Sequence, residues 1–342
     1  MRHLLPEVGQ YFKANLHTHS TVSDGAWTPE QLKKAYKEQG YQIMAFTDHE
    51  VLVPQHHLSD PDFLILNGYE FEVFQPGYSK HHRKTYHLNF FAKDPNQRKQ
   101  LYNHNYNWGN TLNYESQVVC DGDDNRSYSV QAVNDIIRQA NEMGYLVSYN
   151  HPSWCLHSYP DYAGLKGLWA VEVYNNECAL IGYDDDPNVN VFQDLLRQGN
   201  RIFPLATDDF HALPNPRHIF GGWIMVGAQK LEYGSVMQAL EKGDFYASTG
   251  PQIHSLTLEG SKLRLTCDEA VMVKLLTHNR LGQRVLAKPG QSLTQAEFDI
   301  STWLTDCPEE FADMAFLRLK VTNAQGKEAY TRAYWRKELL EL

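Results

Sequence analysis

Short apolar runs and helical patterns alternate through the first two-thirds of the chain. Residues 12–17 and 41–46 have the composition of buried strands, and between them Thr28-Pro29-Glu30 predicts the start of a helix that ends at Gly40. Strands that alternate with helices are typical of βα units around parallel strands, so we expect an α/β domain. By the same criteria, strands are predicted at residues 63–66, 86–91, 145–151, 168–173 and 202–206, and helices at 129–144, 191–196 and 235–242.

The pattern changes after Gly250-Pro251. Short alternating runs at 255–258, 271–276 and 316–321 are separated by turn residues and show little helical periodicity, which is typical of a small β-sandwich. We therefore expect two domains, an α/β domain over residues 1–249 and a β-sandwich over residues 250–342. Within the first domain, residues 94–128 are polar and have no clear period, so we expect an insertion near the mouth of a site.

Acid and imidazole side chains follow the predicted strands. Residues i and i+2 of a strand project to the same face, so His17 and His19 can approach one metal ion together. In barrel enzymes the C-terminal ends of the strands share a rim, which would bring such residues together. The strings concerned are Asn15-Leu16-His17-Thr18-His19, Thr47-Asp48-His49, Tyr149-Asn150-His151-Pro152 and Thr207-Asp208-Asp209-Phe210-His211, and Asp24, Glu70 and His87 can reach the same rim.

The resulting set is larger than one metal ion needs. A catalytic zinc uses three or four ligands, whereas nine carboxylate and imidazole groups are available at successive strand ends. We expect two or three metal ions with Glu70 as a bridging carboxylate. Nitrogen and oxygen donors without a thiolate suit zinc, manganese or iron. Of the 16 histidines, 14 lie at or before His218, which places this chemistry in the first domain.

Composition and charge restrict the class of protein. The chain of 342 residues contains 42% hydrophobic residues, and its net charge of −10 argues against a dedicated nucleic-acid binder. Its five cysteines form no C-x-x-C pair, so neither a disulfide framework nor a thiolate zinc site is indicated. No apolar stretch approaches the ~20 residues of a membrane span, and the first residues lack a signal-peptide pattern. We expect a soluble cytoplasmic protein without a membrane partner, of unspecified oligomeric state.

The order of these motifs resembles a known family. H-x-H, S-D-G, T-D-H, G-x-E, a strand histidine, N-H-P and D-x-H follow one another as in the PHP family, the polymerase and histidinol phosphatase domain, over about residues 10–245. The resemblance implies a distorted (β/α)7 barrel with up to three metal ions at its rim. The string 240–251 also resembles the barrel exit of the branch with a C-terminal β-domain, which includes metallohydrolases of the CehA/McbA type. The metal ligands implied are His17, His19, Asp24, His49, Glu70, His87, His151, one of Asp208 and Asp209, and His211.

Two positions depart from the plainest family pattern. Many members have histidine where this chain has Asp24, so a third metal ion would be held more weakly or differ in identity. The usual S-D-x-H is replaced by T-D-D-F-H. An ungapped alignment selects Asp209 as the ligand, whereas a one-residue bulge selects Asp208, and both readings stay open.

The ligand set points to hydrolysis. A bound divalent ion lowers the pKa of water and polarises the group under attack, so we expect a phosphoesterase that cleaves a small phosphorylated metabolite by attack of a metal-bridging hydroxide. His211 or whichever of Asp208 and Asp209 is not a ligand could protonate the leaving group. The alternatives are hydrolysis of a carboxylic or carbamate ester or an amide at the same site, and a binding or scaffold protein without catalysis. No G-x-S-x-G, Walker or G-x-G-x-x-G motif supports a serine hydrolase, P-loop or Rossmann protein.

Two basic strings are candidates for substrate binding. His81-His82-Arg83-Lys84 precedes the strand of His87, and Arg217-His218 follows the last ligand string. From these we select Arg83, Lys84, Arg217 and His218 as candidate contacts with a phosphate group. A solvated loop is the competing interpretation, because lysine and arginine are usually exposed. Glu172 is either a further ligand or a carboxylate that orients a histidine ligand.

Overall fold

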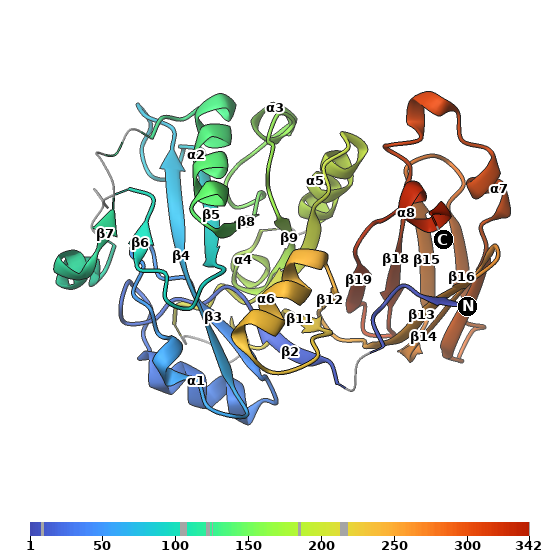
Figure 1. Ribbon diagram of the computed structural model, residues 1–342, viewed down its shortest axis with the longest axis horizontal. Coiled ribbons are helices and arrows are strands. Elements are labelled where there is room, and N and C mark those ends of the chain that lie inside the picture. Colours follow the sequence, from blue (N-terminus) through green and yellow to red (C-terminus); the bar gives the residue numbers. More distant parts are fainter. Residues whose placement is uncertain are drawn as a thin grey trace.

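The computed structural model describes residues 1–7, 10–102, 108–120, 124, 126–183, 186–212 and 218–341. Figure 1 shows a mixed α/β part, coloured blue to yellow, beside the sheets of the C-terminal part, coloured orange to red. The N-terminus lies among the C-terminal sheets rather than beside the α/β strands, because β1 (Arg2–His3) pairs with β13 (Ile253–Glu259). The chain therefore begins in one part and continues in the other.

Seven strands follow one another side by side in the α/β part. Their order is β2 (Phe12–Asn15), β3 (Ile43–Phe46), β4 (Leu64–Phe74), β5 (Thr85–Ala92), β8 (Tyr145–Tyr149), β9 (Ala170–Asn175) and β10 (Phe203–Thr207). Beyond the last strand, His19 N donates to Phe210 O over 2.9 Å and Asp209 N donates to His17 O over 3.0 Å. These two hydrogen bonds link the ends of the series, β2 and β10.

One strand runs against the expected direction. The alternating pattern predicts parallel strands, and β2–β3–β4 and β8–β9–β10 are parallel, but β5 is antiparallel to both β4 and β8. No helix separates β4 from β5, and a short connection allows only an antiparallel pair. The prediction of parallel strands throughout is thus wrong for β5. Its first residues, not its last, lie at the rim where the parallel strands end.

The four predicted helices are present, but two of them begin earlier than predicted, and two short helices were not predicted. Helix α1 (Pro29–Glu38) has a capping box, in which the Thr28 side chain accepts from Gln31 N and the Gln31 side chain accepts from Thr28 N. Helix α6 (Tyr233–Lys242) ends at Gly243, whose φ of 72° is left-handed. The other helices of this part are α2 (Val130–Glu142), α3 (Tyr159–Tyr162), α4 (Asn176–Ile181) and α5 (Asp186–Arg197), with a 3₁₀ turn at His56–Leu58. Helix α5 begins at Asp186 rather than near residue 191 and α6 at Tyr233 rather than at residue 235, and α3 and α4 are the helices that were not predicted.

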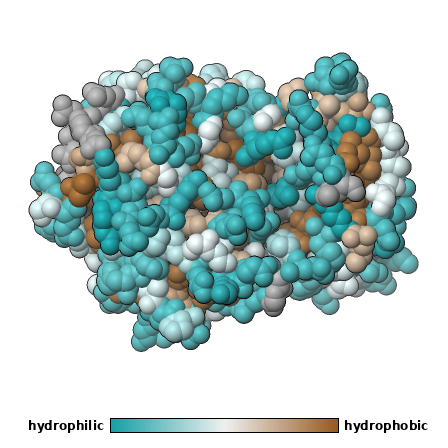
Figure 2. Space-filling view, viewed as in Figure 1, coloured by the Kyte–Doolittle hydropathy of each residue, from teal (hydrophilic) through white to brown (hydrophobic). Residues whose placement is uncertain are grey.

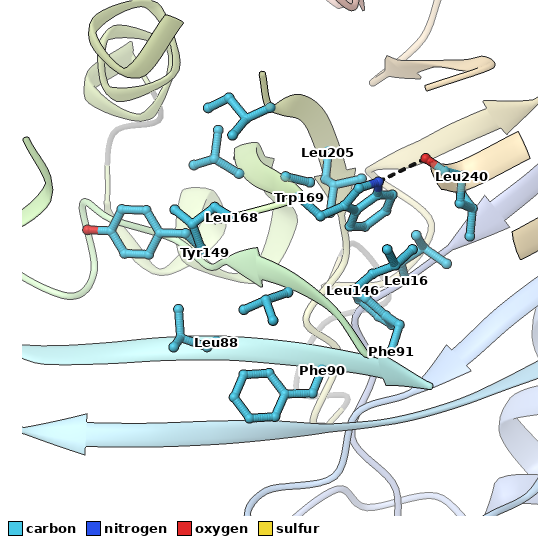
Figure 3. Close-up of a cluster of buried hydrophobic side chains, with 14 of the residues drawn as sticks. Leu16, Leu88, Phe90, Phe91, Leu146, Tyr149, Leu168, Trp169, Leu205 and Leu240 are labelled. Atoms are coloured by element: carbon cyan, nitrogen blue, oxygen red, sulfur yellow. Dashed lines mark hydrogen bonds between the residues drawn. The ribbon is translucent and has the colours of Figure 1, made fainter. Parts of the chain in front are cut away.

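The core of the α/β part lies between the strands and these helices. Figure 3 shows Leu88 and Phe90 of β5, Leu146 and Tyr149 of β8, and Trp169 before β9 packed together. The Trp169 indole donates from Nε1 to Leu240 O of α6 over 2.8 Å, which satisfies its polar atom inside the cluster. This interior supports the strands whose ends carry the candidate ligands.

The segment predicted to be an insertion contains few regular elements. Strands β6 (Lys99–Gln100) and β7 (Val119–Cys120) pair with each other, and a 3₁₀ helix spans Thr111–Gln117. Residues 103–107, 121–123 and 125 lie outside the described residues. Asn110 N donates to Ser23 O over 2.8 Å, so this segment contacts the loop that follows β2.

Two sheets form the C-terminal part. One contains β1, β13, β14 (Lys262–Ala270) and β17 (Leu293–Asp299), and the other contains β15 (Met272–Thr277), β16 (Gln283–Leu286), β18 (Phe316–Thr322), β19 (Glu328–Thr331) and β20 (Tyr334–Trp335). Leu265 of the first sheet and Leu319 of the second belong to one buried cluster. The short helices α7 (Ser301–Thr305) and α8 (Arg336–Leu340) and a 3₁₀ turn at Glu309–Phe311 complete this part.

Strand pairing crosses the predicted boundary at residue 250. Strand β11 (Trp223–Val226) pairs with β2 and with β12 (Phe245–Ser248), and β12 pairs in turn with β19. The hydrogen-bonded ladder therefore continues from the α/β strands into the C-terminal sheet. The division at residue 250 stays a prediction.

The surface seen in Figure 2 is mostly hydrophilic, with hydrophobic residues scattered over it. Among the helices that the structure describes, none has both the length and the apolar character that a membrane crossing requires.

Candidate metal centre

The candidate ligands converge at one rim of the α/β part. His17 and His19 follow β2, His49 follows β3 and His151 follows β8, whereas Asp209 and His211 follow β10. His87 is the third residue of β5 and reaches the same rim because this strand is reversed. Most of these side chains are fully buried; Asp24 and His211 are the more open ones, with 29% and 25% of their side-chain surface exposed.

Glu70 lies at the middle of the cluster. Its Oε1 is 3.3 Å from His17 Nε2, 3.1 Å from His87 Nδ1 and 3.4 Å from His151 Nε2. Its Oε2 is 3.1 Å from His49 Nδ1 and 3.4 Å from His19 Nε2. One carboxylate thus lies within 3.4 Å of nitrogen atoms of five imidazoles.

The donor atoms form overlapping groups in which all atoms lie within 4.8 Å of one another. One group is His19, Asp24, His49 and His211, and the next is His17, His19, Glu70 and Asp209. A third is His49, Glu70 and His87, and a fourth is His17, His151 and Glu172. Each group mixes imidazole nitrogen with carboxylate oxygen, the donor set expected for a hard or intermediate divalent ion.

Unsatisfied polar atoms inside the cluster also fit a cation. Glu70 Oε2, Asp209 Oδ1, His19 Nδ1 and His49 Nδ1 are buried and make no hydrogen bond within the described structure. A buried charged group without a partner costs more than the ~1–3 kcal/mol of a neutral one, so native proteins rarely keep several at one place. Metal ions at these positions would satisfy them.

The two aspartates of the string 207–211 point in different directions. The Asp208 carboxylate accepts hydrogen bonds from Tyr36 Oη (2.7 Å) and from the backbone amides of residues 220, 221 and 222 (2.8, 2.7 and 3.0 Å). Asp209 Oδ1 instead lies 3.0 Å from His17 Nε2 and 3.1 Å from His19 Nε2. Asp208 therefore ties β10 to a neighbouring loop, and Asp209 faces the cluster.

Further carboxylates contact the imidazoles of the cluster, and of these Glu172 is placed where it could bind a metal ion or orient a histidine ligand. Glu172 Oε1 is 2.6 Å from His17 Nδ1, and Glu172 Oε2 accepts from His151 N over 2.8 Å. Glu177 of α4 is 3.3 Å from His211 Nδ1. Asp48 accepts from the amide and hydroxyl of Ser20 and of Ser23, which fixes the loop that carries Asp24. Such outer contacts set the orientation and basicity of a ligand.

The backbone is strained where the cluster forms. Glu50, His151 and Asp209 have φ values of 62°, 26° and 53°, in the left-handed region that residues other than glycine seldom adopt. Residues held in such conformations cost about 1–3 kcal/mol each and concentrate at functional sites. The strain turns the side chains of His151 and Asp209 into the cluster.

Charge and burial fix the protonation of the cluster. Burial lowers the pKa of His19 to about 3, and the nearby His211 and His49 act in the same direction. Burial opposes ionisation of Glu70, but His87, His17 and His49 outweigh it and hold the pKa of Glu70 well below its usual range. Burial also opposes protonation of His87 and His211, but Glu70 beside His87 and Glu177 beside His211 outweigh it and raise the pKa of each imidazole to about 10. Metal ions bind neutral imidazole and ionised carboxylate, so metal binding would release the protons of these two imidazoles.

A cavity of about 340 Å³ opens over the cluster. Trp108 and Trp154 form its walls, with the Trp108 ring stacked on His49 at a centroid distance of 4.2 Å. Lys80 also lines the cavity and lies 5.3 Å from the Trp108 ring centre. Lys80 and Glu177 were not selected from the sequence, although Lys80 directly precedes the basic string 81–84 and Glu177 follows β9 by two residues.

The four candidate substrate contacts have different positions. Arg83 lines a smaller hollow that shares Lys80, Trp108 and Trp154 with the cavity, and it is 3.3 Å from Glu72. Lys84 pairs with Asp161 at 2.6 Å. Arg217 lies outside the described residues, and His218 is half-buried and does not line the cavity. Of the three candidate contacts that the structure describes, it places Arg83 next to the candidate centre.

A test of the local packing concerns Gly25, in the loop beside Asp24. A Cβ at this residue would lie 2.2 Å from His19 O, so Gly25→Ala is expected to displace the loop and destabilise the fold by about 1–3 kcal/mol. Gly234→Ala is the matched control, because nothing lies within 4 Å of its Cβ and alanine favours the α6 helix. Urea unfolding measures both; equal stabilities for the two variants would contradict the packing argument.

Known proteins resemble this chain over parts of its length. Residues 15–167 match the family model of the PHP domain. A segment of 45 residues is 51% identical to part of the DNA polymerase/3'-5' exonuclease PolX of Bacillus subtilis. The aligned segment makes up 13% of this chain and 8% of that relative. The chain thus spans a small fraction of the length of this curated relative.

Two solved structures are similar at low identity. A two-domain protein from Bacteroides vulgatus, containing a predicted PHP-like metal-dependent phosphoesterase, aligns with 98% of both chains at 15% identity and a TM-score of 0.46. An amidohydrolase from Chromobacterium violaceum with bound sulfate aligns with 59% of this chain and 88% of its own at 15% identity and a TM-score of 0.37. The likeness to the PHP domain family rests on the sequence match over residues 15–167 and on the motifs within it.

Proposed function

We propose that this protein is a metal-dependent hydrolase that cleaves the phosphate ester of a small metabolite. The observation that carries the proposal is the Glu70 carboxylate, shared by five imidazoles beneath an open cavity. A purely structural metal site tends to be small and closed. The PHP match over residues 15–167 covers the part of the chain that carries most of this cluster.

We propose that two or three divalent ions bind at the overlapping groups of donors. Bound there, such ions would lower the pKa of water and polarise a phosphoryl oxygen. Zinc, manganese and iron all suit the donor types. The proposed ligands are His17, His19, Asp24, His49, Glu70, His87, His151, Asp209 and His211.

The proposal also includes the barrel. Seven strands in sequence order and the hydrogen bonds between residues 17–19 and 209–210 support closure of the series into a distorted (β/α)7 barrel. Closure accounts for the placement of the Asp209 and His17 side chains 3.0 Å apart, although the two residues are far apart in the sequence.

The remaining side chains of the cavity would bind and shield the substrate. Lys80 and Arg83 supply positive charge near the cavity, which favours a substrate with a negative group. Trp108 and Trp154 provide flat apolar walls that exclude water from the reacting group. Asp208 makes four hydrogen bonds of its own and is turned away from the cavity, so we assign it no part in proton transfer.

The direct test is an activity screen on protein reconstituted with zinc, manganese or iron. Sugar, amino-acid and nucleotide monophosphates should be hydrolysed, and matched carboxylic esters and amides should not. His17→Ala, which removes a central donor, is the inactive control. Turnover of esters or amides alone would replace phosphatase activity by the alternative reaction, and no turnover of any substrate by metal-loaded protein would contradict the proposal.

Lys80 provides a test of substrate charge. Replacing Lys80 with glutamine is expected to raise KM for a phosphate monoester roughly tenfold with little change in kcat, because the lysine would bind the anionic group before and during reaction alike. Lys166→Gln removes the same charge at an exposed position away from the cavity and should leave KM unchanged. Steady-state kinetics with both variants decides whether Lys80 contacts substrate.

A further inference from the structure

A second cleft lies between the α/β part and the C-terminal sheet. It has a volume of about 630 Å³ and is lined by one face of α5 and by residues of β15, β16 and β18. None of its lining residues also lines the cavity over the candidate metal centre. Clefts of about 300–1,000 Å³ are the size that small organic ligands occupy.

The cleft is strongly basic in a chain whose net charge is −10. Five cationic residues line it, and none of its described lining residues is acidic. Arg197 is 4.0 Å from Asp194, and within the described residues Lys274, Arg280 and Arg284 make no ion pair. Cations gathered in one cleft concentrate positive potential there and attract an anionic ligand. The five cations are Arg197, Lys274, Arg280, Arg284 and Arg318.

Arg318 is the most informative of these residues because it is buried. Only 1% of its surface is exposed, and its Nε donates to Gln193 Oε1 over 3.0 Å. Its Nη1 is buried without a hydrogen-bond partner in the described structure. Burial lowers the pKa of this guanidinium to about 10, although Tyr330 and Glu328 act in the opposite direction. A buried cation is normally paired, and removal of its partner is strongly destabilising.

We propose that this cleft is a binding site for a small organic molecule with a phosphate group, whose phosphate contacts the Arg318 guanidinium. The planar guanidinium matches phosphate oxygens with two parallel hydrogen bonds, and phosphate carries enough charge to compensate several cations. Arg280 and Arg284 lie at the exposed side of the cleft and would complete the contact. Leu276 and Val189 supply apolar surface for the organic part of the ligand.

The probes for this site are inorganic phosphate and phenylphosphonate, which has the same charged group on an organic ring and is not hydrolysed as an ester. Because the metal centre could also bind them, calorimetric titrations are made in the full-length Asp209→Asn variant as well as in the unmodified protein. Both proteins should bind phenylphosphonate, and more tightly than phosphate. Benzyl alcohol, which has the ring without the charge, should not bind.

The variant that tests the cleft is Arg280→Gln with Arg284→Gln, because both side chains are exposed and their replacement leaves the core intact. Added to Asp209→Asn, this pair should weaken phenylphosphonate binding about tenfold or more, since a hydrogen bond to a charged group contributes at least that factor. Lys34→Gln with Lys166→Gln, which also removes two charges at exposed residues away from the cleft, is the matched control and should have no effect. Circular dichroism shows whether each variant is folded. Phenylphosphonate binding to an Arg318→Met variant is interpreted only if that variant is folded.

Two results would overturn the proposal. One is the absence of phenylphosphonate binding to the Asp209→Asn protein. The other is binding that the arginine pair leaves unchanged. In either case the candidate metal centre would account for any phosphate bound to the unmodified protein.

Discussion

The Asp209→Asn variant is expected to lose more than about 100-fold in metal-dependent turnover. A loss of 10–100-fold is usual when a residue outside the ligands is removed, and Asp209 lies within the cluster, 3.0 Å and 3.1 Å from the ring nitrogens of His17 and His19. Asparagine adopts the left-handed backbone of this position more readily than most residues, so the fold should be retained. Metal content by elemental analysis and steady-state kinetics measure the effect.

The neighbouring residue provides the control. Asp208→Asn should keep metal binding but lose about 2 kcal/mol or more of folding stability, because its carboxylate accepts from Tyr36 and from the amides of residues 220–222. The opposite outcome, with metal lost from Asp208→Asn and retained in Asp209→Asn, would reverse the assignment. The pair therefore resolves the ambiguity that the sequence leaves.

Removal of metal is expected to lower the melting temperature by several degrees. A ligand present at 100 to 1,000 times its dissociation constant stabilises the native state by about 2.7–4.1 kcal/mol. Without it, the buried oxygens of Glu70 and Asp209 again lack partners. Differential scanning calorimetry before and after treatment with a chelator measures the shift.

Two comparisons make this measurement specific to the cluster. Addition of manganese or zinc to the chelated protein should restore the original melting temperature. The Asp209→Asn variant should respond less to chelation than the unmodified protein. An identical melting temperature with and without metal would mean that the cluster holds no ion under these conditions.

The sequence predicts the structure best where an apolar strand pattern is followed directly by a motif of candidate ligands. The strands before His17, His49 and His151 were predicted because apolar β-forming residues precede a polar motif, and β2, β3 and β8 lie there. The predicted helices also begin at recognisable caps, Thr28 and Ser129. These features are local, so neighbouring residues determine them.

Features that depend on distant residues could not be predicted in this way. The reversed direction of β5 follows from its pairing with both β4 and β8, which no local pattern records. The choice between Asp208 and Asp209 depends on the φ of 53° at Asp209 and on a loop some 12 residues further on that binds Asp208. The basic string 81–84 indicated this loop as a substrate contact, but which of its cations lines the cavity depends on the folded loop, and it is the preceding Lys80 that does so.

The basic cleft was missed for a related reason. Arg197, Lys274 and Arg318 are widely separated in the sequence and come together only when α5 packs against the C-terminal strands. Net charge describes the whole chain and conceals this local excess. Sequence patterns thus indicate the candidate metal centre and give no sign of the second cleft.

The pairing of β12 with β19 and of β1 with β13 has a consequence for how such a protein can be divided. A fragment ending near residue 249 would expose the edge of β12 and leave β1 without its partner strand, and the complementary fragment would expose β19 and β13. Unpaired strand edges promote association between chains. Fragments divided near residue 250 are therefore expected to associate more readily than the full chain.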